Sequence, residues 1–440
     1  MISPSFSVTR AARSQQSDLA KSVSRRERLV EASIFLIGLS SAFYTKAGGT
    51  LFLLDVIFLC VAAGALFAKS KQNIVLVERL LFCFLGVWFL GAMVSDVVNQ
   101  TPPQNYLRGW GKIATFTMAL IAVIRLINGK LQRLAYYLMG IAAASALQAA
   151  LFPNPYQAGE PWKFGFAIPI ATAAMAALAI RKRPSTLVVQ CGLPFVLAIL
   201  NLVLNYRSLF VILLAVTAIV GLAWYKRMAF GARKVMYPMV ATATLLVLAI
   251  GGWGVQTTYS AVASSGMLGQ KALDKYNMQT RGDLGLLLGG RKESLVSTRA
   301  IADAPFLGHG SWASDSRYNA LMVLMLRERG VETNGTIKSE VIPSHSYFFG
   351  SWVEAGIAGA IFWAFCFVIS LVALPRLIDL TGPSLPLLAL CTIQLLWNIP
   401  FSPFGADSRF TVAAQLVAVI AVLNAWNTQL SSPQRAQIKR

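Results

Sequence analysis

The sequence predicts an all-α polytopic membrane protein with about twelve transmembrane helices and one large, partly helical external loop late in the chain. Three observations predict this fold class. Of the 440 residues, 56% are hydrophobic and only 13% are charged, which lies well outside the usage of soluble globular domains. Apolar runs long enough to cross about 30 Å of hydrocarbon recur along the chain. One long polar stretch, residues 257–344, interrupts them.

The apolar runs are predicted to be helices, because lipid cannot satisfy an open backbone and a barrel would show alternating rather than solid apolar runs. The predicted spans are 29–44, 49–67, 74–95, 109–124, 134–151, 163–180, 185–204, 208–224, 236–255, 346–373, 384–400 and 410–426. Lys46, Gly48 and Gly49 separate the first two runs, so these two could instead be partly re-entrant.

The net charge of +21 is distributed as a topology signal. Basic residues precede the first span and fill alternate short loops, as Arg10, Arg13, Lys21, Arg25, Arg26, Arg28, Lys69, Lys71, Arg125, Lys130, Arg133, Arg181, Lys182, Arg183, Lys226, Arg227, Arg233, Lys234, Arg376, Arg435, Lys439 and Arg440. The remaining short loops are poor in Lys and Arg. By the positive-inside rule the basic loops and both termini lie in the cytoplasm and the polar stretch lies outside. This placement argues against nucleic acid as a partner.

The predicted organisation has five parts. These are a basic cytoplasmic tail (1–28), nine spans (29–255), an external loop (256–344), three spans (345–426) and a cytoplasmic tail (427–440). The basic N-terminus shows no cleavable signal-peptide pattern, so we expect it to remain as a tail and the first span to direct insertion.

Metal and nucleotide chemistry find little support in the sequence. All five cysteines lie in predicted spans, namely Cys60, Cys83, Cys191, Cys366 and Cys391. The external loop therefore has no disulfide and no Cys-based zinc site. It also lacks the spacings of histidine–carboxylate zinc sites and calcium loops, and the chain has no GxxxxGK[ST] loop for nucleotide phosphates. No metal and no cofactor is expected.

Arg207, in the segment LNYRSLFVILL, is placed at the outer end of the eighth predicted span. A guanidinium at that depth is costly unless it pairs, snorkels or faces a wet cavity, so it is a candidate functional residue. It could equally be a snorkelling interfacial arginine, although a positive charge is disfavoured on the outside.

A second group of cations lies in the external loop at Arg281, Arg291, Lys292 and Arg299. The apolar positions between Lys292 and Ala304 predict a short amphipathic helix that Pro305 ends. Arg291 would then lie near the start of this helix and reach back to the membrane surface. For Lys292 and Arg299 a solvated basic face is the simpler interpretation.

Both histidines of the chain lie in or beside the loop. His345 lies at the water boundary where the tenth span begins, and an imidazole there can accept a proton near pH 7. The alternative is an amphipathic anchor at the interface. His309, between two glycines, is interpreted as a loop residue.

These elements together resemble the O-antigen ligase and polymerase superfamily of bacterial envelope glycosyltransferases. The resemblance rests on Arg207 and on a loop pattern that has Gly290 and Arg291, a short helix, Pro305, Gly308 and Gly310, then His345, Glu354, Gly356 and Gly359. It covers roughly residues 205–359, and the remainder matches only as a hydropathy profile. The chain departs from the family pattern at Ser346, where Asn is common, and at Tyr206, where Ser is usual.

The resemblance implies a GT-C-like fold in the bacterial inner membrane, with the active site facing the periplasm. The donor would be a glycan on undecaprenyl pyrophosphate. Arg207 and Arg291 would bind the pyrophosphate and stabilise its developing charge, because a guanidinium can hold two phosphate oxygens and stays charged. His345 would orient or deprotonate the acceptor hydroxyl. Direct attack predicts inversion at the anomeric carbon.

Two choices stay open at this point. The acceptor could be a lipid A-core sugar, as for a ligase, or another lipid-linked repeat unit, as for a polymerase. From other classes, the rivals are a transporter or flippase of a lipid-linked glycan or anionic solute, with Arg207 in its path, and a noncatalytic scaffold. The sequence also leaves open whether Arg281, Arg299, Arg317 or Arg409 joins the pyrophosphate site. Glu354 is interpreted as a helix N-terminal carboxylate.

Overall fold

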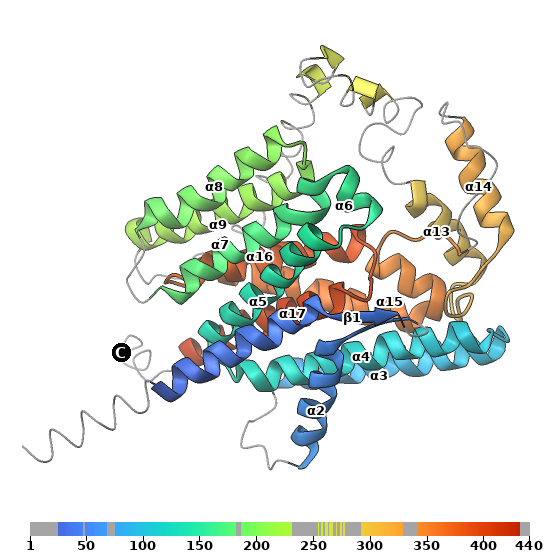
Figure 1. The fold of residues 1–440 in the computed structure, drawn as a ribbon, viewed down its shortest axis with the longest axis horizontal. Coiled ribbons are helices and arrows are strands. Elements are labelled where there is room, and N and C mark those ends of the chain that lie inside the picture. The colour runs from blue at the N-terminus through green and yellow to red at the C-terminus, as the bar shows by residue number, and fades with distance from the viewer. Residues whose placement is uncertain are drawn as a thin grey trace, which may run out of the picture.

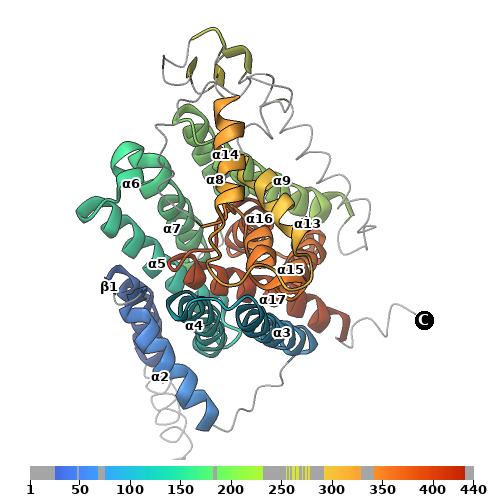
Figure 2. The same cartoon turned by 90° about the vertical axis from the view of Figure 1, so that its right-hand side faces the viewer.

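The computed structural model describes residues 25–46, 49–67, 75–181, 186–230, isolated positions between 254 and 277, 292–328 and 341–431. These residues form a bundle of long helices with two shorter helices over one end (Figures 1 and 2). Residues 25–39 are helical and lead into η1 (Ser40–Ala42) and a hairpin of β1 (Tyr44–Lys46) and β2 (Thr50–Phe52).

The helices that follow are apolar and mostly long. They are α2 (Leu53–Phe67), α3 (Leu76–Val98), α4 (Pro103–Ile127), α5 (Leu131–Leu151), α6 (Pro155–Gly159), α7 (Ala167–Ile180), α8 (Leu187–Val203), α9 (Arg207–Phe230), α13 (Lys292–Asp303), α14 (Ser316–Arg327), α15 (Tyr347–Ala373), α16 (Leu385–Phe401) and α17 (Ser408–Ser431). A π-helical turn, η2 (Trp162–Phe166), precedes α7, and the 3-10 helix η3 (Leu374–Asp379) follows α15.

Among the described residues, seven helices are long and apolar enough to cross a membrane, and three shorter apolar helices accompany them. The chain is therefore a polytopic, membrane-embedded helical protein, as predicted. The total of twelve spans stays a prediction, and its ninth span, 236–255, lies outside the described residues. The first two predicted spans differ from the expectation, because a β-hairpin around Lys46 separates them and α2 begins only at Leu53.

The hairpin is held to the bundle by a buried ion pair. Arg409 of α17 and Asp55 of α2 are only 4% and 6% exposed, and Arg409 Nε donates to Asp55 Oδ1 at 3.0 Å. Asp55 Oδ2 also accepts the backbone N–H of Phe52 at 2.8 Å. The Arg409 guanidinium lies 5.5 Å from the centre of the Phe52 ring and 5.0 Å from that of Phe410. Opposite charges buried together satisfy each other where either one alone would be costly.

An aromatic cluster packs α15 against α3 and α4. Trp88, Phe116, Phe362 and Trp363 are fully buried, and the rings of Trp88 and Phe362 stack with centroids 5.1 Å apart. Trp363 Nε1 donates to Ser351 Oγ at 2.8 Å, so the one polar atom of this ring is satisfied. Close packing of this kind holds membrane helices together, since lipid offers no hydrophobic drive for association.

The helix α15 is kinked near its start. Ala355 and Gly356 depart from helical geometry, and Gly356 has φ 59° and ψ −151°, a conformation that favours glycine. The kink exposes backbone groups that the segment after α13 contacts. At the opposite end of the bundle, Lys226 of α9 forms an ion pair with Asp379 of η3.

Candidate functional site

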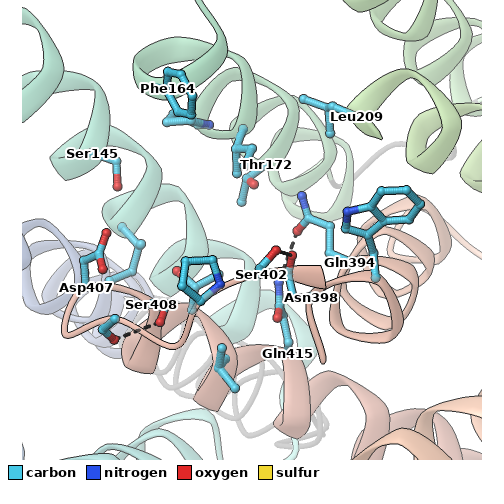
Figure 3. Close-up of a pocket in the computed structure, with 18 of the residues that line it drawn as sticks. Ser145, Phe164, Thr172, Leu209, Gln394, Asn398, Ser402, Asp407, Ser408 and Gln415 are labelled. Atoms are coloured by element: carbon cyan, nitrogen blue, oxygen red, sulfur yellow. Dashed lines mark hydrogen bonds between the residues drawn. The ribbon is translucent and has the colours of Figure 1, made fainter. Parts of the chain in front are cut away.

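A cavity of about 730 Å³ opens at the end of the bundle where α5 and α16 end and where α9, α15 and α17 begin. Figure 3 shows that its labelled lining residues are contributed by several helices. Most of its polar lining is amide or hydroxyl, as in Gln148, Gln157, Thr172, Ser208, Gln394, Asn398, Ser402, Ser408 and Gln415. Concave sites of this size with convergent polar groups are the usual places of small-molecule binding.

Three charged side chains and one histidine line the cavity beside these neutral ones. They are Lys163, Glu293, His345 and Asp407. Lys163 lies in the π-helical turn η2, a distortion that is frequent at functional sites. Its Nζ lies 3.4 Å from Glu160 Oε2 and 4.4 Å from the centre of the Phe164 ring. The cavity wall therefore carries both signs of charge.

His345 lines the cavity and is exposed. It directly precedes Ser346, the N-cap residue of α15, whose Oγ accepts the backbone N–H of Phe349 at 3.1 Å and donates to the Ile399 carbonyl at 2.8 Å. The cap fixes the backbone beside the imidazole to the end of α16. Ser346 thus has a structural role as a helix cap.

Arg207 is the first residue of α9 and is half-buried. Tyr206 and Ser208, its neighbours on both sides, line the cavity. The turn before it is tight, because Asn205 has φ 58° and the Tyr206 N–H donates to the Asn201 carbonyl at 2.7 Å. This turn brings the start of α9 to the cavity.

Arg291 lies outside the described residues. Glu293 and Ser294, which follow it closely in sequence at the start of α13, line the cavity. The helix predicted from Lys292 is present and ends at Asp303, with Val296 and Ala300 fully buried. Ser297 Oγ donates to the Pro343 carbonyl at 2.8 Å, which ties α13 to the segment just before His345.

The glycines of the segment after α13 pack against the kink in α15. The N–H groups of His309 and Gly310 donate to the carbonyls of Val353 at 2.7 Å and Glu354 at 3.1 Å. In return, the Ile357 N–H donates to the Phe306 carbonyl at 3.2 Å. A Cβ at Gly308, which has φ 73°, would lie 2.6 Å from the Gly356 nitrogen. We call residues 306–311 and the α15 kink the latch.

Asp96 lies near the end of α3, is only 3% exposed, and holds the latch through hydrogen bonds. Its carboxylate accepts the Ser311 N–H at 2.6 Å, the Ser311 hydroxyl at 2.8 Å and Trp110 Nε1 at 2.8 Å. Ser95 Oγ accepts the Gly310 N–H at 3.1 Å and donates to the Glu354 carbonyl at 2.9 Å. Ser95 and Asp96 thus satisfy buried polar groups of the latch.

His309 belongs to the latch and not to the cavity. Its Nε2 lies 2.8 Å from the Ala300 carbonyl, and its ring meets that of Tyr318 edge-on at 5.5 Å. Burial and the hydrogen bond to Asp303, at 2.8 Å, raise the pKa of the Tyr318 hydroxyl to about 12. The interpretation of His309 as a loop residue agrees with this geometry.

The other cations that the sequence left open are engaged elsewhere. Arg299 Nε lies 3.4 Å from Asp303 Oδ1 on α13, Arg317 Nη2 lies 2.7 Å from Asp315 Oδ2 at the start of α14, and Arg409 pairs with Asp55. None of these three lines the cavity. Arg281 lies outside the described residues. Glu354 forms an ion pair with Lys112 of α4, beside the kink, and so has a specific partner that its sequence position did not reveal.

Several cavity residues escaped the sequence analysis. Lys163 follows a short turn at the start of an apolar span, while Gln394 and Gln415 lie inside apolar spans. A polar side chain within such a run is itself a signal, because membrane helices rarely carry one without a role. Within the described ranges, no group of three or more His, Cys, Asp and Glu side chains could hold a metal ion.

Comparison of the chain with protein-family models, with curated proteins and with solved structures finds no match.

Proposed function

We propose that the protein is a bacterial envelope glycosyltransferase of the O-antigen ligase and polymerase class, which transfers a glycan from undecaprenyl pyrophosphate to an acceptor hydroxyl. One observation carries the proposal. A single cavity is lined by His345, by Tyr206 and Ser208 on either side of Arg207, and by Glu293 and Ser294, which lie two and three residues after Arg291. Residues that are more than a hundred positions apart in the chain thus converge on one place, beside many neutral hydrogen-bonding groups of the kind that bind sugars.

The cavity lies at the end of the bundle that the charge pattern assigns to the outside. The ends of α5 and α16 and the starts of α9, α15 and α17 meet there, whereas the basic loops lie at the other ends of these helices. An undecaprenyl chain in the outer leaflet would place its pyrophosphate at this level. The site would face the periplasm of a bacterial inner membrane.

In the proposed reaction the acceptor hydroxyl oxygen attacks the anomeric carbon from the face opposite the pyrophosphate. A new carbon–oxygen bond forms as the bond to the pyrophosphate breaks, and the electron pair leaves with the phosphate oxygen, so the configuration inverts. His345 orients the hydroxyl and takes its proton. General base catalysis of this kind raises the reaction rate by about 10²- to 10⁴-fold. Arg207 and Arg291 stabilise the charge that develops on the departing pyrophosphate.

The test is transfer in proteoliposomes that hold the protein and a lipid-linked glycan from the host's own membranes. We expect release of undecaprenyl pyrophosphate together with glycan transfer, and loss of both in His345→Ala, Arg207→Ala and Arg291→Ala. Arg317→Ala is the matched control, because Arg317 is an exposed arginine of α14 that pairs with Asp315 away from the cavity. The acceptor that becomes labelled separates ligase from polymerase.

Two results would replace the proposal. Movement of the intact lipid-linked glycan across the bilayer, with no transfer, would make the protein a transporter. If neither transfer nor movement occurs with host donor and acceptor both present, the protein would be a noncatalytic scaffold.

A further inference from the structure

The cavity has a charged rim and a neutral floor. Its charged and titratable lining residues lie at helix ends and turns, whereas Thr172, Gln394 and Gln415 lie within α7, α16 and α17. Apolar side chains such as Leu138 and Ile212 also belong to the lining. Figure 3 shows Thr172, Gln394 and Gln415 converging from separate helices.

The floor is deep in the bundle. Gln394 lies seven residues before the end of α16 at Phe401, and Gln415 lies seven residues after the start of α17 at Ser408. At about 1.5 Å per residue, both lie about 10 Å from the cavity-side ends of their helices. A polar group at this depth is costly unless it has a hydrogen-bond partner.

Gln415 has such a partner for only one of its two polar atoms. It is 1% exposed, and its Nε2 donates to Gln394 Oε1 at 3.2 Å. Gln415 Oε1 is buried and accepts no hydrogen bond. Contact between α16 and α17 accounts for the amide pair, but it leaves the buried Oε1 of Gln415, a residue that lines the cavity, without a donor. A buried acceptor without a donor favours a ligand that supplies one.

The chemistry of the floor restricts that ligand. The floor carries no charge, so a pyrophosphate there would lose its hydration without compensation. An isoprenoid chain has no donor for Gln415 Oε1. A hydroxyl-bearing, uncharged group satisfies both conditions, and Trp397, one turn from Gln394 and also in the lining, offers an apolar face beside it.

We infer that the floor formed by Thr172, Gln394 and Gln415 binds an uncharged sugar residue of the lipid-linked glycan, with Gln415 Oε1 accepting a hydrogen bond from a sugar hydroxyl. This inference rests on the proposed function, because it divides the same cavity between the two parts of one donor. The pyrophosphate stays at the rim beside the start of α9, and the glycan reaches the floor.

The test is equilibrium binding of two radiolabelled probes to the purified protein. One probe is the undecaprenyl-pyrophosphate-linked glycan from the host's own membranes, and the other is bare undecaprenyl pyrophosphate. Gln415→Met keeps the length of the side chain and removes the acceptor. We expect this variant to bind the glycosylated probe roughly 3- to 10-fold more weakly, the size of one or two neutral hydrogen bonds, and to bind the bare carrier as the wild type does.

The matched control is Thr392→Val. Thr392 is fully buried in α16 and donates to the Leu388 carbonyl of its own helix at 2.8 Å, and it does not line the cavity. This variant should bind both probes as the wild type does.

An equal affinity of Gln415→Met and wild type for the glycosylated probe would overturn the inference, and so would an equal loss for both probes. Its failure is distinguishable from that of the proposed function. If the wild type transfers glycan but Gln415→Met loses no more affinity for the glycosylated probe than for the bare carrier, only the inference of a sugar-binding floor is wrong. If Gln415→Met weakens binding of the glycosylated probe alone but the wild type transfers no glycan, the transferase proposal is wrong and the sugar-binding floor is supported.

Discussion

The two histidines of the chain lie in regions built in opposite ways. His309 lies in the latch, where its ring bonds the Ala300 carbonyl and packs on Tyr318. His345 lies at the rim of the cavity, exposed, with only the backbone beside it fixed by the Ser346 cap. The His309 imidazole is therefore engaged in contacts within the fold, whereas the His345 imidazole is exposed at the cavity.

The same contrast separates the two parts of the loop motif. Gly308, Gly310 and Gly356 bring two backbones into contact and leave no room for a side chain, so these glycines serve the fold. The cavity depends instead on side chains that face open space. Much of the loop motif therefore serves backbone packing at the α15 kink, whereas His345, the proposed catalytic residue, lies at the cavity.

The strongest test of this comparison replaces each histidine in turn. His345→Ala should lower the rate of glycan transfer by about 10² to 10⁴ and leave the thermal midpoint unchanged, because the residue is exposed. His309→Ala should lose about 1 kcal/mol of stability with its hydrogen bond and keep the rate within a few-fold. Initial rates and thermal unfolding of both variants measure this. Similar losses of rate in both would contradict the division.

The second test breaks the latch at its kink. In Gly356→Ala the new Cβ would collide with the Phe306 carbonyl at φ 59°, and we expect more than about 2 kcal/mol of destabilisation. Gly86→Ala is the control, since nothing lies within 4 Å of its added Cβ and its position in α3 is helical. Thermal unfolding in detergent compares the two, and equal midpoints would show that the kink tolerates a side chain.

The third test removes the carboxylate under the latch. Asp96→Ala leaves the Ser311 N–H, the Ser311 hydroxyl and Trp110 Nε1 without their acceptor, at a cost of about 1 to 3 kcal/mol. Asp96→Asn keeps one acceptor oxygen and should lose less. Protease cleavage of residues 306–311 should rise in the same order, Ala above Asn above wild type. Unchanged cleavage in both variants would show that Asp96 does not hold residues 306–311 in place.

The smallest expected effect concerns helix α14 and tests whether this helix is stabilised separately from the latch. The hydrogen bond from Arg317 holds the pKa of Asp315 below its ordinary value of 3.8. A lowered pKa means that the folded state favours the ionised carboxylate, so this stabilisation is present above about pH 4 and is lost as the pH falls through the folded-state pKa. Amide exchange in α14 should therefore rise below that pH in wild type, while Asp315→Asn shows no such step.

The helical membrane class was predictable because solid apolar runs of about 20 residues have few other solutions. The hairpin at Lys46 was not, since three-residue strands leave no periodic signal and the buried ion pair beside it joins Asp55 to Arg409, far away in sequence. His345 and its place at a helix start were readable from the boundary between polar and apolar sequence. The pairing of Glu354 with Lys112 and of Gln394 with Gln415 was not, because it depends on which helices pack together.

The central claim is that one cavity, between the start of α9 and the start of α15, holds the lipid-linked donor. Its most direct test is an electron cryomicroscopy structure of the His345→Ala protein in nanodiscs with the host's undecaprenyl-pyrophosphate-linked glycan. We predict density for the pyrophosphate at the rim beside Arg207 and residue 345, with the first sugars extending toward Gln415. A donor bound outside this cavity, with the cavity empty, would contradict the account.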